Sequence, residues 1–106
     1  MKQIWFKQKF YNPILEGQKT QTIRLWKRNP NLIINQEFEC FFGFNHPTLI
    51  GIIENITLKT FNDLTDEEIK LDGHEYREAL YNNLKEYYID FNKQKSLYLI
   101  RFKLKL

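Results

Sequence analysis

The chain has 106 residues, a length that suits one compact domain, so we predict a single domain over residues 1–106. Hydrophobic residues make up 42% of the sequence and aromatic residues 16%, which is enough for a buried core and excludes a disordered chain. The net charge of +3 is a mild excess and does not by itself indicate a polyanionic partner.

The first predicted elements are a short helix over residues 8–17 and a strand over residues 20–26. Gly17 is placed to end the helix in a left-handed conformation. The strand is indicated by alternation of polar and apolar residues. This alternation puts four side chains on one face: Thr20, Thr22, Arg24 and Trp26.

Two further strands, two helices and a last strand follow in the sequence. We predict strands over residues 37–44 and 49–60, and a helix that opens on a capping-box pattern and covers residues 65–72. A second helix is predicted over residues 75–87 and a half-exposed strand over residues 97–106. The strand over residues 37–44 points four side chains to one face: Phe38, Cys40, Phe42 and Phe44.

This order of elements predicts an α+β fold, a small and partly closed β-barrel of mixed strands. A short helix precedes the barrel strands, and two helices stand before the last strand. Helices gathered at one end of a set of strands are typical of such architectures.

Cysteine usage and hydropathy indicate a cytoplasmic protein without a membrane partner. The single cysteine, Cys40, cannot form an intramolecular disulfide, and small secreted domains usually need such bonds. Charged and amide residues interrupt the first ten positions, unlike the apolar run of a signal peptide. No apolar stretch approaches the length of a membrane span.

The sequence contains no pattern that indicates a metal ion or a cofactor. One cysteine with two isolated histidines, His46 and His74, does not form a usual zinc site. Four scattered glycines build neither a phosphate loop nor a dinucleotide fingerprint. Cys40 shares a predicted strand face with phenylalanines, so we expect a buried, inert thiol instead of a nucleophile.

Basic residues gather in the first 28 positions, where Glu16 is the single acid. The same segment carries Trp5 and Trp26, a combination typical of surfaces that bind nucleic acid. Thr22, Arg24 and Trp26 would offer a hydroxyl, a planar cation and a stacking surface to a nucleobase. The pattern fits equally well a solvated edge strand on which Trp26 caps the core.

Residues 14–24, Ile-Leu-Glu-Gly-Gln-Lys-Thr-Gln-Thr-Ile-Arg, strongly resemble the signature segment of ASCH domains, which are relatives of the PUA domain. The resemblance continues through residues 64–74 and ends with residues 97–102, so that it covers nearly the whole chain. It implies a PUA-like β-barrel with a cleft lined by the signature strand. It also implies RNA binding, and one bacterial branch of the family hydrolyses N4-acetylcytidine to cytidine and acetate.

The resemblance assigns the catalytic lysine, threonine and glutamate of that branch to Lys19, Thr22 and Asp72, and the family arginine to Arg24. A threonine hydroxyl attacks only after a base takes its proton, and a lysine is that base only when its pKa is lowered. Asp72 lacks one methylene of the glutamate, about 1.2–1.5 Å of reach, and such a misplacement costs about 100-fold in rate. The nearby Glu75 is the alternative carboxylate.

Two functions at one site therefore stay open, together with a third elsewhere. The first is binding of RNA or a modified nucleoside by a cleft along residues 19–27, through Thr20, Arg24, Trp26, Lys27 and Arg28. The second is an amidohydrolase for N4-acetylcytidine that uses Lys19, Thr22 and Asp72. The third is an interaction protein that pairs its terminal strand with a partner.

Overall fold

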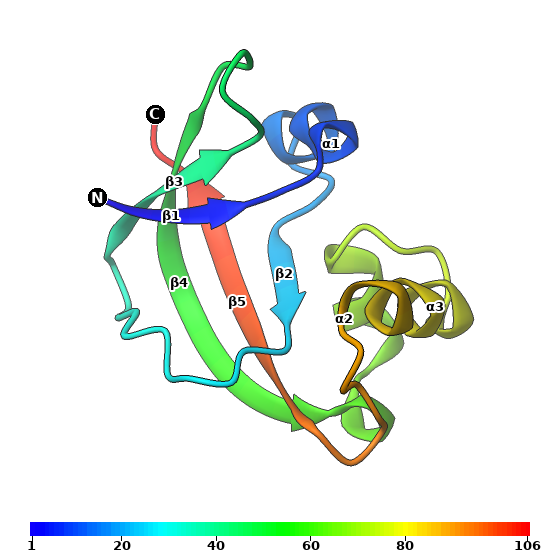
Figure 1. Ribbon diagram of the computed structural model, residues 1–106. Coiled ribbons are helices and arrows are strands. Elements are labelled where there is room, and N and C mark those ends of the chain that lie inside the picture. The colour runs from blue at the N-terminus through cyan, green and yellow to red at the C-terminus, as the bar shows by residue number, and fades with distance from the viewer.

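Five strands form a single sheet in the computed structural model, which describes residues 1–106 (Figure 1). They are β1 (Lys2–Trp5), β2 (Gln21–Arg24), β3 (Glu37–Phe41), β4 (Leu49–Thr60) and β5 (Ser96–Leu104). Neighbours in the sheet follow the order β1-β3-β4-β5-β2. The pair β1–β3 is parallel, and the other pairs are antiparallel. The predicted α+β class is confirmed.

The helices stand at two places along the sheet. The short elements η1 (Gln8–Phe10) and α1 (Tyr11–Leu15) follow β1, whereas η2 (Phe61–Asp63), α2 (Asp66–Leu71) and α3 (Arg77–Tyr87) lie between β4 and β5 in sequence. Figure 1 shows α2 and α3 side by side beyond β2.

Local signals at two helix ends are confirmed. Gly17 follows α1 with φ of 80°, the left-handed conformation expected of it. The Thr65 side chain accepts from the backbone of Glu68, and the Glu68 carboxylate accepts from the backbone of Thr65, which completes the predicted capping box.

Three sequence-based expectations about strands need correction. β1 was not predicted, because only Ile4 of its four residues is buried and its pairing with β3 is not visible in local alternation. The strand expected over residues 20–26 is shorter and ends at Arg24. The strand expected over residues 37–44 ends at Phe41; Gly43 has φ of 122°, and Phe44 is 87% exposed.

The partly closed barrel that was predicted is not confirmed, because the sheet is open. β1 and β2 are the two edges of the sheet, and no backbone ladder joins them. A side chain bridges this gap instead: the Arg24 guanidinium of β2 donates to the Trp5 carbonyl oxygen of β1 and to the Thr22 hydroxyl. The open edge leaves room for a pocket where a barrel would have paired strands.

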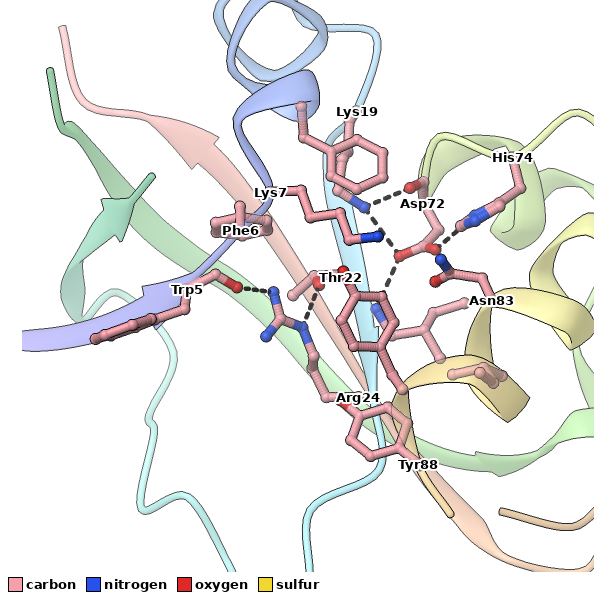
Figure 2. Close-up of a pocket in the computed structure, with 14 residues that line it drawn as sticks. Trp5, Phe6, Lys7, Lys19, Thr22, Arg24, Asp72, His74, Asn83 and Tyr88 are labelled. Atoms are coloured by element: carbon pink, nitrogen blue, oxygen red, sulfur yellow. Dashed lines mark hydrogen bonds and ion pairs between the residues drawn. The ribbon is translucent and has the colours of Figure 1, made fainter. Parts of the chain in front are cut away.

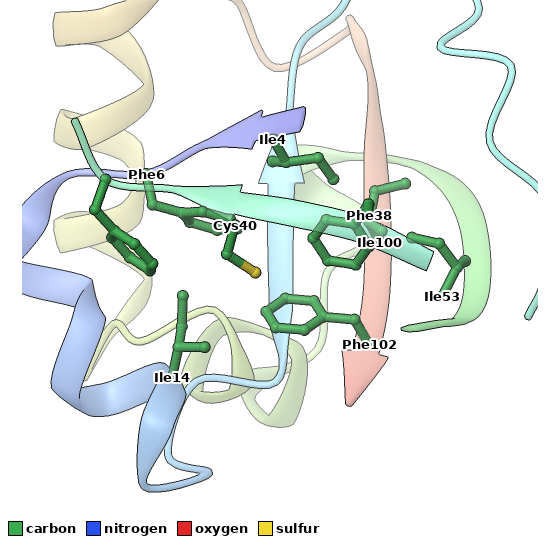
Figure 3. Packing of buried hydrophobic residues seen from close by; sticks show 9 residues of the cluster. Ile4, Phe6, Ile14, Phe38, Cys40, Ile53, Ile100 and Phe102 are labelled. Atoms are coloured by element: carbon green, nitrogen blue, oxygen red, sulfur yellow. The ribbon is translucent and has the colours of Figure 1, made fainter. Parts of the chain in front are cut away.

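Two hydrophobic clusters hold the sheet in place. The first contains Phe38, Phe102 and Cys40 among its nine buried residues (Figure 3). The second packs β2 and β5 against the helices of residues 61–87. Cys40 is fully buried, as expected, and burial raises the pKa of its thiol to about 12, which disfavours the reactive thiolate. No helix in the protein has the length and apolar character that a membrane crossing requires.

Candidate functional site

A pocket opens between the two clusters, at the unpaired edge of the sheet (Figure 2). Its walls come from the segment after β1, from β2, from the end of α2 and from α3. The cavity volume is about 90 Å³. We call it the central pocket. Strands β1 and β2 and the helices of residues 66–87, which are distant in sequence, meet here.

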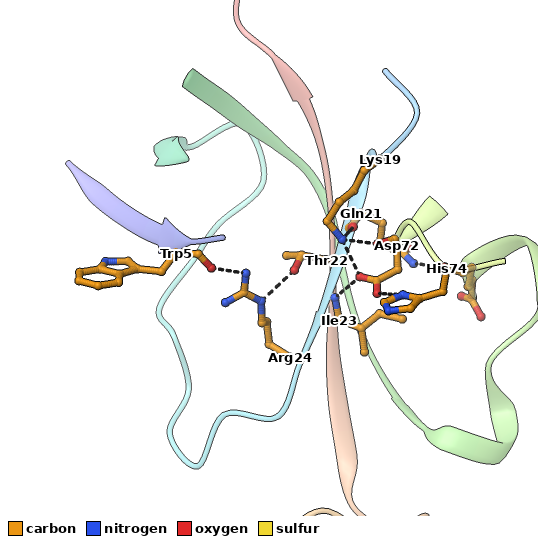
Figure 4. A network of polar contacts seen from close by, with 9 residues as sticks. Trp5, Lys19, Gln21, Thr22, Ile23, Arg24, Asp72 and His74 are labelled. Carbon is orange, nitrogen blue, oxygen red and sulfur yellow. Dashed lines mark hydrogen bonds and ion pairs between the residues drawn. The ribbon is translucent and has the colours of Figure 1, made fainter. Parts of the chain in front are cut away.

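Lys19 and Asp72 form a buried ion pair in the central pocket; they are 3% and 4% exposed. The Lys19 Nζ lies 3.0 Å from the Asp72 Oδ1 (Figure 4). It also donates to the backbone oxygen of Asp72 and, over 3.0 Å, to the backbone oxygen of Gln21. The Asp72 Oδ1 accepts a further bond of 2.8 Å from the Ile23 N–H. The aspartate side chain therefore reaches the ammonium directly.

Burial sets the electrostatics of Lys19. Desolvation lowers its pKa, and the neighbouring Arg24 and Lys9 lower it further, while the carboxylate of Asp72 acts in the opposite direction. The ammonium also lies 4.7 Å from the centre of the Phe10 ring, a cation–π contact. Lys19 is thus more easily deprotonated than an exposed lysine, although each of its three protons has an acceptor in this structure.

Thr22 and Arg24 project into the same pocket from alternate positions of β2. The Arg24 Nε donates to the Thr22 Oγ1 over 2.8 Å, which leaves the hydroxyl proton of Thr22 without a protein acceptor. Arg24 also covers the Phe6 ring at 4.9 Å. Burial lowers the Arg24 pKa, but a guanidinium keeps its charge at neutral pH.

His74 lies directly beside the ion pair. Its Nδ1 is 2.9 Å from the Asp72 Oδ2, yet the two atoms are not aligned for a hydrogen bond, and this nitrogen is buried without a partner. Glu75, the alternative carboxylate, is exposed and outside the central pocket. No group of three or more His, Cys, Asp or Glu side chains lies close enough to hold a metal ion.

The other residues expected to contact RNA lie outside the central pocket. Trp26 is half-buried against Tyr98, with ring centres 5.6 Å apart. It lines a neighbouring hollow of about 500 Å³, which we call the basic hollow because Lys2, Lys27 and Arg28 line it and no acid does. Thr20 lines neither the central pocket nor the basic hollow; its backbone pairs with residues 71 and 102.

Sequence reasoning gave no role in the site to several residues of the central pocket, and it noted Trp5 and Lys7 only as members of the basic segment; the others are Phe6, Asn83 and Tyr88. Trp5, Phe6 and Lys7 belong to the end of an unpredicted strand and the segment after it. Asn83 and Tyr88 come from α3 and the residue after it. No spacing in the sequence relates α3 to the signature strand, so only the tertiary fold brings these side chains together.

Comparison with solved structures places the fold among ASCH-domain proteins. The ASCH domain of Lactobacillus crispatus aligns with a TM-score of 0.72 and 19% identity over 97% of this chain and 78% of that one. A mutant ASCH protein from Zymomonas mobilis aligns with a TM-score of 0.65 and 16% identity, covering 95% and 67%. An Enterococcus faecalis protein of the DUF984 family aligns with a TM-score of 0.75 and 15% identity, covering 98% and 80%.

The comparisons concern three-dimensional structure alone. The sequence matches no protein-family profile and no curated protein. The resemblance to ASCH domains seen in the signature segment is thus confirmed at the level of the fold, over nearly the whole chain.

Proposed function

We propose that the chain binds a nucleoside, modified or within RNA, by inserting the edge of its base into the central pocket. The observation that carries this proposal is the placement of Arg24 beside the buried Lys19–Asp72 pair, at an opening between the sheet edges. A planar guanidinium next to aromatic walls suits a flat, polar ligand. The cavity is smaller than the roughly 300–1,000 Å³ of pockets for drug-sized ligands. Sugar and phosphate therefore stay outside.

The basic hollow extends this proposal to RNA. Trp26, which lines the basic hollow, follows Arg24 of the central pocket by two residues along the chain, although the two cavities share no lining residue. Lys27 is largely exposed there; its contact with Asp90 is 3.3 Å long between two exposed groups and is weak. Exposed cations with weak contacts of this kind suit the phosphates next to a base held in the central pocket.

A salt titration tests the role of the basic hollow. The double variant Lys27→Gln and Arg28→Gln is expected to weaken binding of a single-stranded RNA oligonucleotide. Each lost phosphate contact changes the log–log salt slope by about 0.7, so the slope should become shallower by about 1.4. Filter-binding affinities measured from low to high salt concentration give this slope.

The matched control removes two exposed charges from the helices, Lys70→Gln with Lys85→Gln. An equal change of slope in the control would show that only net charge matters. An affinity that does not depend on salt in the wild type would remove RNA backbone binding from the proposal.

Hydrolysis of N4-acetylcytidine is the second candidate, and one observation favours it: Lys19, Thr22 and Asp72 line one cavity. The Thr22 oxygen would attack the acetyl carbonyl after losing its proton to Lys19, and Arg24 N–H groups would stabilise the oxyanion. Lys19 passes the proton taken from Thr22 to N4 as the N4–acetyl bond breaks and cytidine leaves, and water then hydrolyses the acetyl–threonine ester to release acetate. Lys19 must first give up a proton, since all its protons are engaged and none contacts Thr22.

One experiment separates the two candidates. A panel of nucleosides that includes N4-acetylcytidine is measured by calorimetry for binding and by chromatography for cytidine release. Saturable binding without product supports the binding function alone. Product formation that is lost in a Lys19→Ala variant that is still folded and still binds the nucleoside supports the hydrolase, whereas full turnover in Lys19→Ala would exclude the assigned roles. No binding to any nucleoside would exclude both functions.

A further inference from the structure

Asn83 brings a neutral amide into a pocket whose other polar side chains are mostly ions. It lies in the last turns of α3, next to Leu84, which is 2% exposed and anchors the helix in the second cluster. The Asn83 side chain is half-buried and points into the central pocket (Figure 2). A rigid helix therefore holds this amide at the wall of the cavity.

Most other polar groups of the central pocket already have protein partners. Lys19 donates to three acceptors, and the Asp72 Oδ1 accepts from Lys19 and from a backbone N–H. Arg24 donates to Trp5 and Thr22. No hydrogen bond joins the Asn83 amide to any of the residues drawn in Figure 2. A ligand that covers this amide must supply its partners, because an unpaired buried amide is costly.

The hydrogen-bonding groups of the Asn83 amide limit which ligand groups can pair with it. A carboxamide presents an acceptor oxygen next to a donor nitrogen, and its complement is a ligand edge with a donor next to an acceptor. Adenine offers such an edge at N6 and N7, and cytosine offers one at N4 and N3. A phosphate is acceptor-only, and the cations Lys7 and Arg24 suit it better.

We propose that Asn83 is the specificity-determining residue of the central pocket, and that it selects bases whose exocyclic amino group lies beside a ring nitrogen. This inference rests on the proposed nucleoside binding. It assigns the discrimination between bases to α3, whereas Lys19 and Arg24 come from β2 and the segment before it, and Asp72 from the residue after α2.

Two matched ligand pairs test the inference. Cytidine is compared with pyrimidin-2-one ribonucleoside, and adenosine with purine ribonucleoside; the second member of each pair lacks the amino group. For the pair that the wild type binds, we expect the amino form to bind more tightly. Asn83→Ala should weaken the amino form about tenfold, which corresponds to about 1.4 kcal/mol, and should remove this preference, because the bidentate contact to the base edge is lost.

Two further variants complete the experiment. Asn83→Asp keeps an acceptor for the amino group and should retain part of the preference. Asn82→Ala removes the same amide from an exposed position of the same helix and should change nothing. An Asn83→Ala variant that keeps the wild-type preference, or weakens both members of the pair equally, overturns the role of Asn83 and leaves nucleoside binding intact. Absence of wild-type binding to all four nucleosides overturns the proposed function itself.

Discussion

Lys19→Met is expected to lower the free energy of unfolding by about 3–5 kcal/mol, the usual cost of leaving one member of a buried ion pair alone. Without the lysine, the Asp72 carboxylate would lie in a site with almost no solvent contact and would keep the Ile23 N–H as a hydrogen-bond donor, but not the ammonium 3.0 Å from its Oδ1. Methionine retains the length and much of the volume of the lysine stem, so the loss reports on charge and hydrogen bonds more than on packing.

Urea denaturation measures this loss, with Lys9→Met as the control because Lys9 is exposed. The double variant Lys19→Met with Asp72→Leu completes a thermodynamic cycle. We expect it to lose less stability than the two single variants together, because neither charge is then left unpaired. Additive losses would show that Lys19 and Asp72 are not coupled, which would contradict the ion pair as described.

Thr22→Val is expected to reduce acetate release from N4-acetylcytidine by about 1,000-fold or more, because the variant lacks the proposed nucleophilic oxygen. Valine keeps the shape of threonine, so cytidine binding should stay within a few fold. The Arg24 Nε loses its acceptor, at a cost of about 1–3 kcal/mol in stability, and the assay therefore requires a thermal melt showing that the variant is folded.

Thr20→Val is the matched control, since Thr20 is two residues away on the same segment and outside the central pocket.

The rate of N4-acetylcytidine hydrolysis by the wild type should rise with pH as Lys19 loses its proton. Desolvation lowers the Lys19 pKa, so this rise should come at lower pH than for an exposed lysine. Unchanged turnover in Thr22→Val would exclude threonine as the nucleophile.

Stability and function are linked in this pocket by the same atoms. The Lys19 ammonium holds the end of α2 against β2 through the Asp72 carboxylate and backbone oxygen. A lysine in this role positions the pocket even when it takes part in no reaction. Measuring both unfolding and turnover in each variant is therefore what separates a structural lysine from a catalytic one.

Parts of the candidate site were visible in the sequence because they are local. Alternation along the signature strand puts Thr22 and Arg24 on one face, and both line the central pocket. The resemblance to ASCH domains singled out Lys19 and Asp72. In the structure the Lys19 Nζ lies 3.0 Å from the Asp72 Oδ1. Neither spacing nor periodicity relates two residues that lie 53 positions apart, half the length of the chain, so without the resemblance this pair would not have been found.

By itself the sequence determined the α+β class, the helix limits at Gly17 and Thr65, and the buried state of Cys40, since capping and alternation are short-range effects. Only the tertiary structure decided that β1 pairs with β3 and that the sheet stays open beside β2. Strand pairing and the approach of α3 depend on contacts between residues far apart in the chain. Those long-range contacts put Asn83 in the central pocket and leave Trp26 outside it.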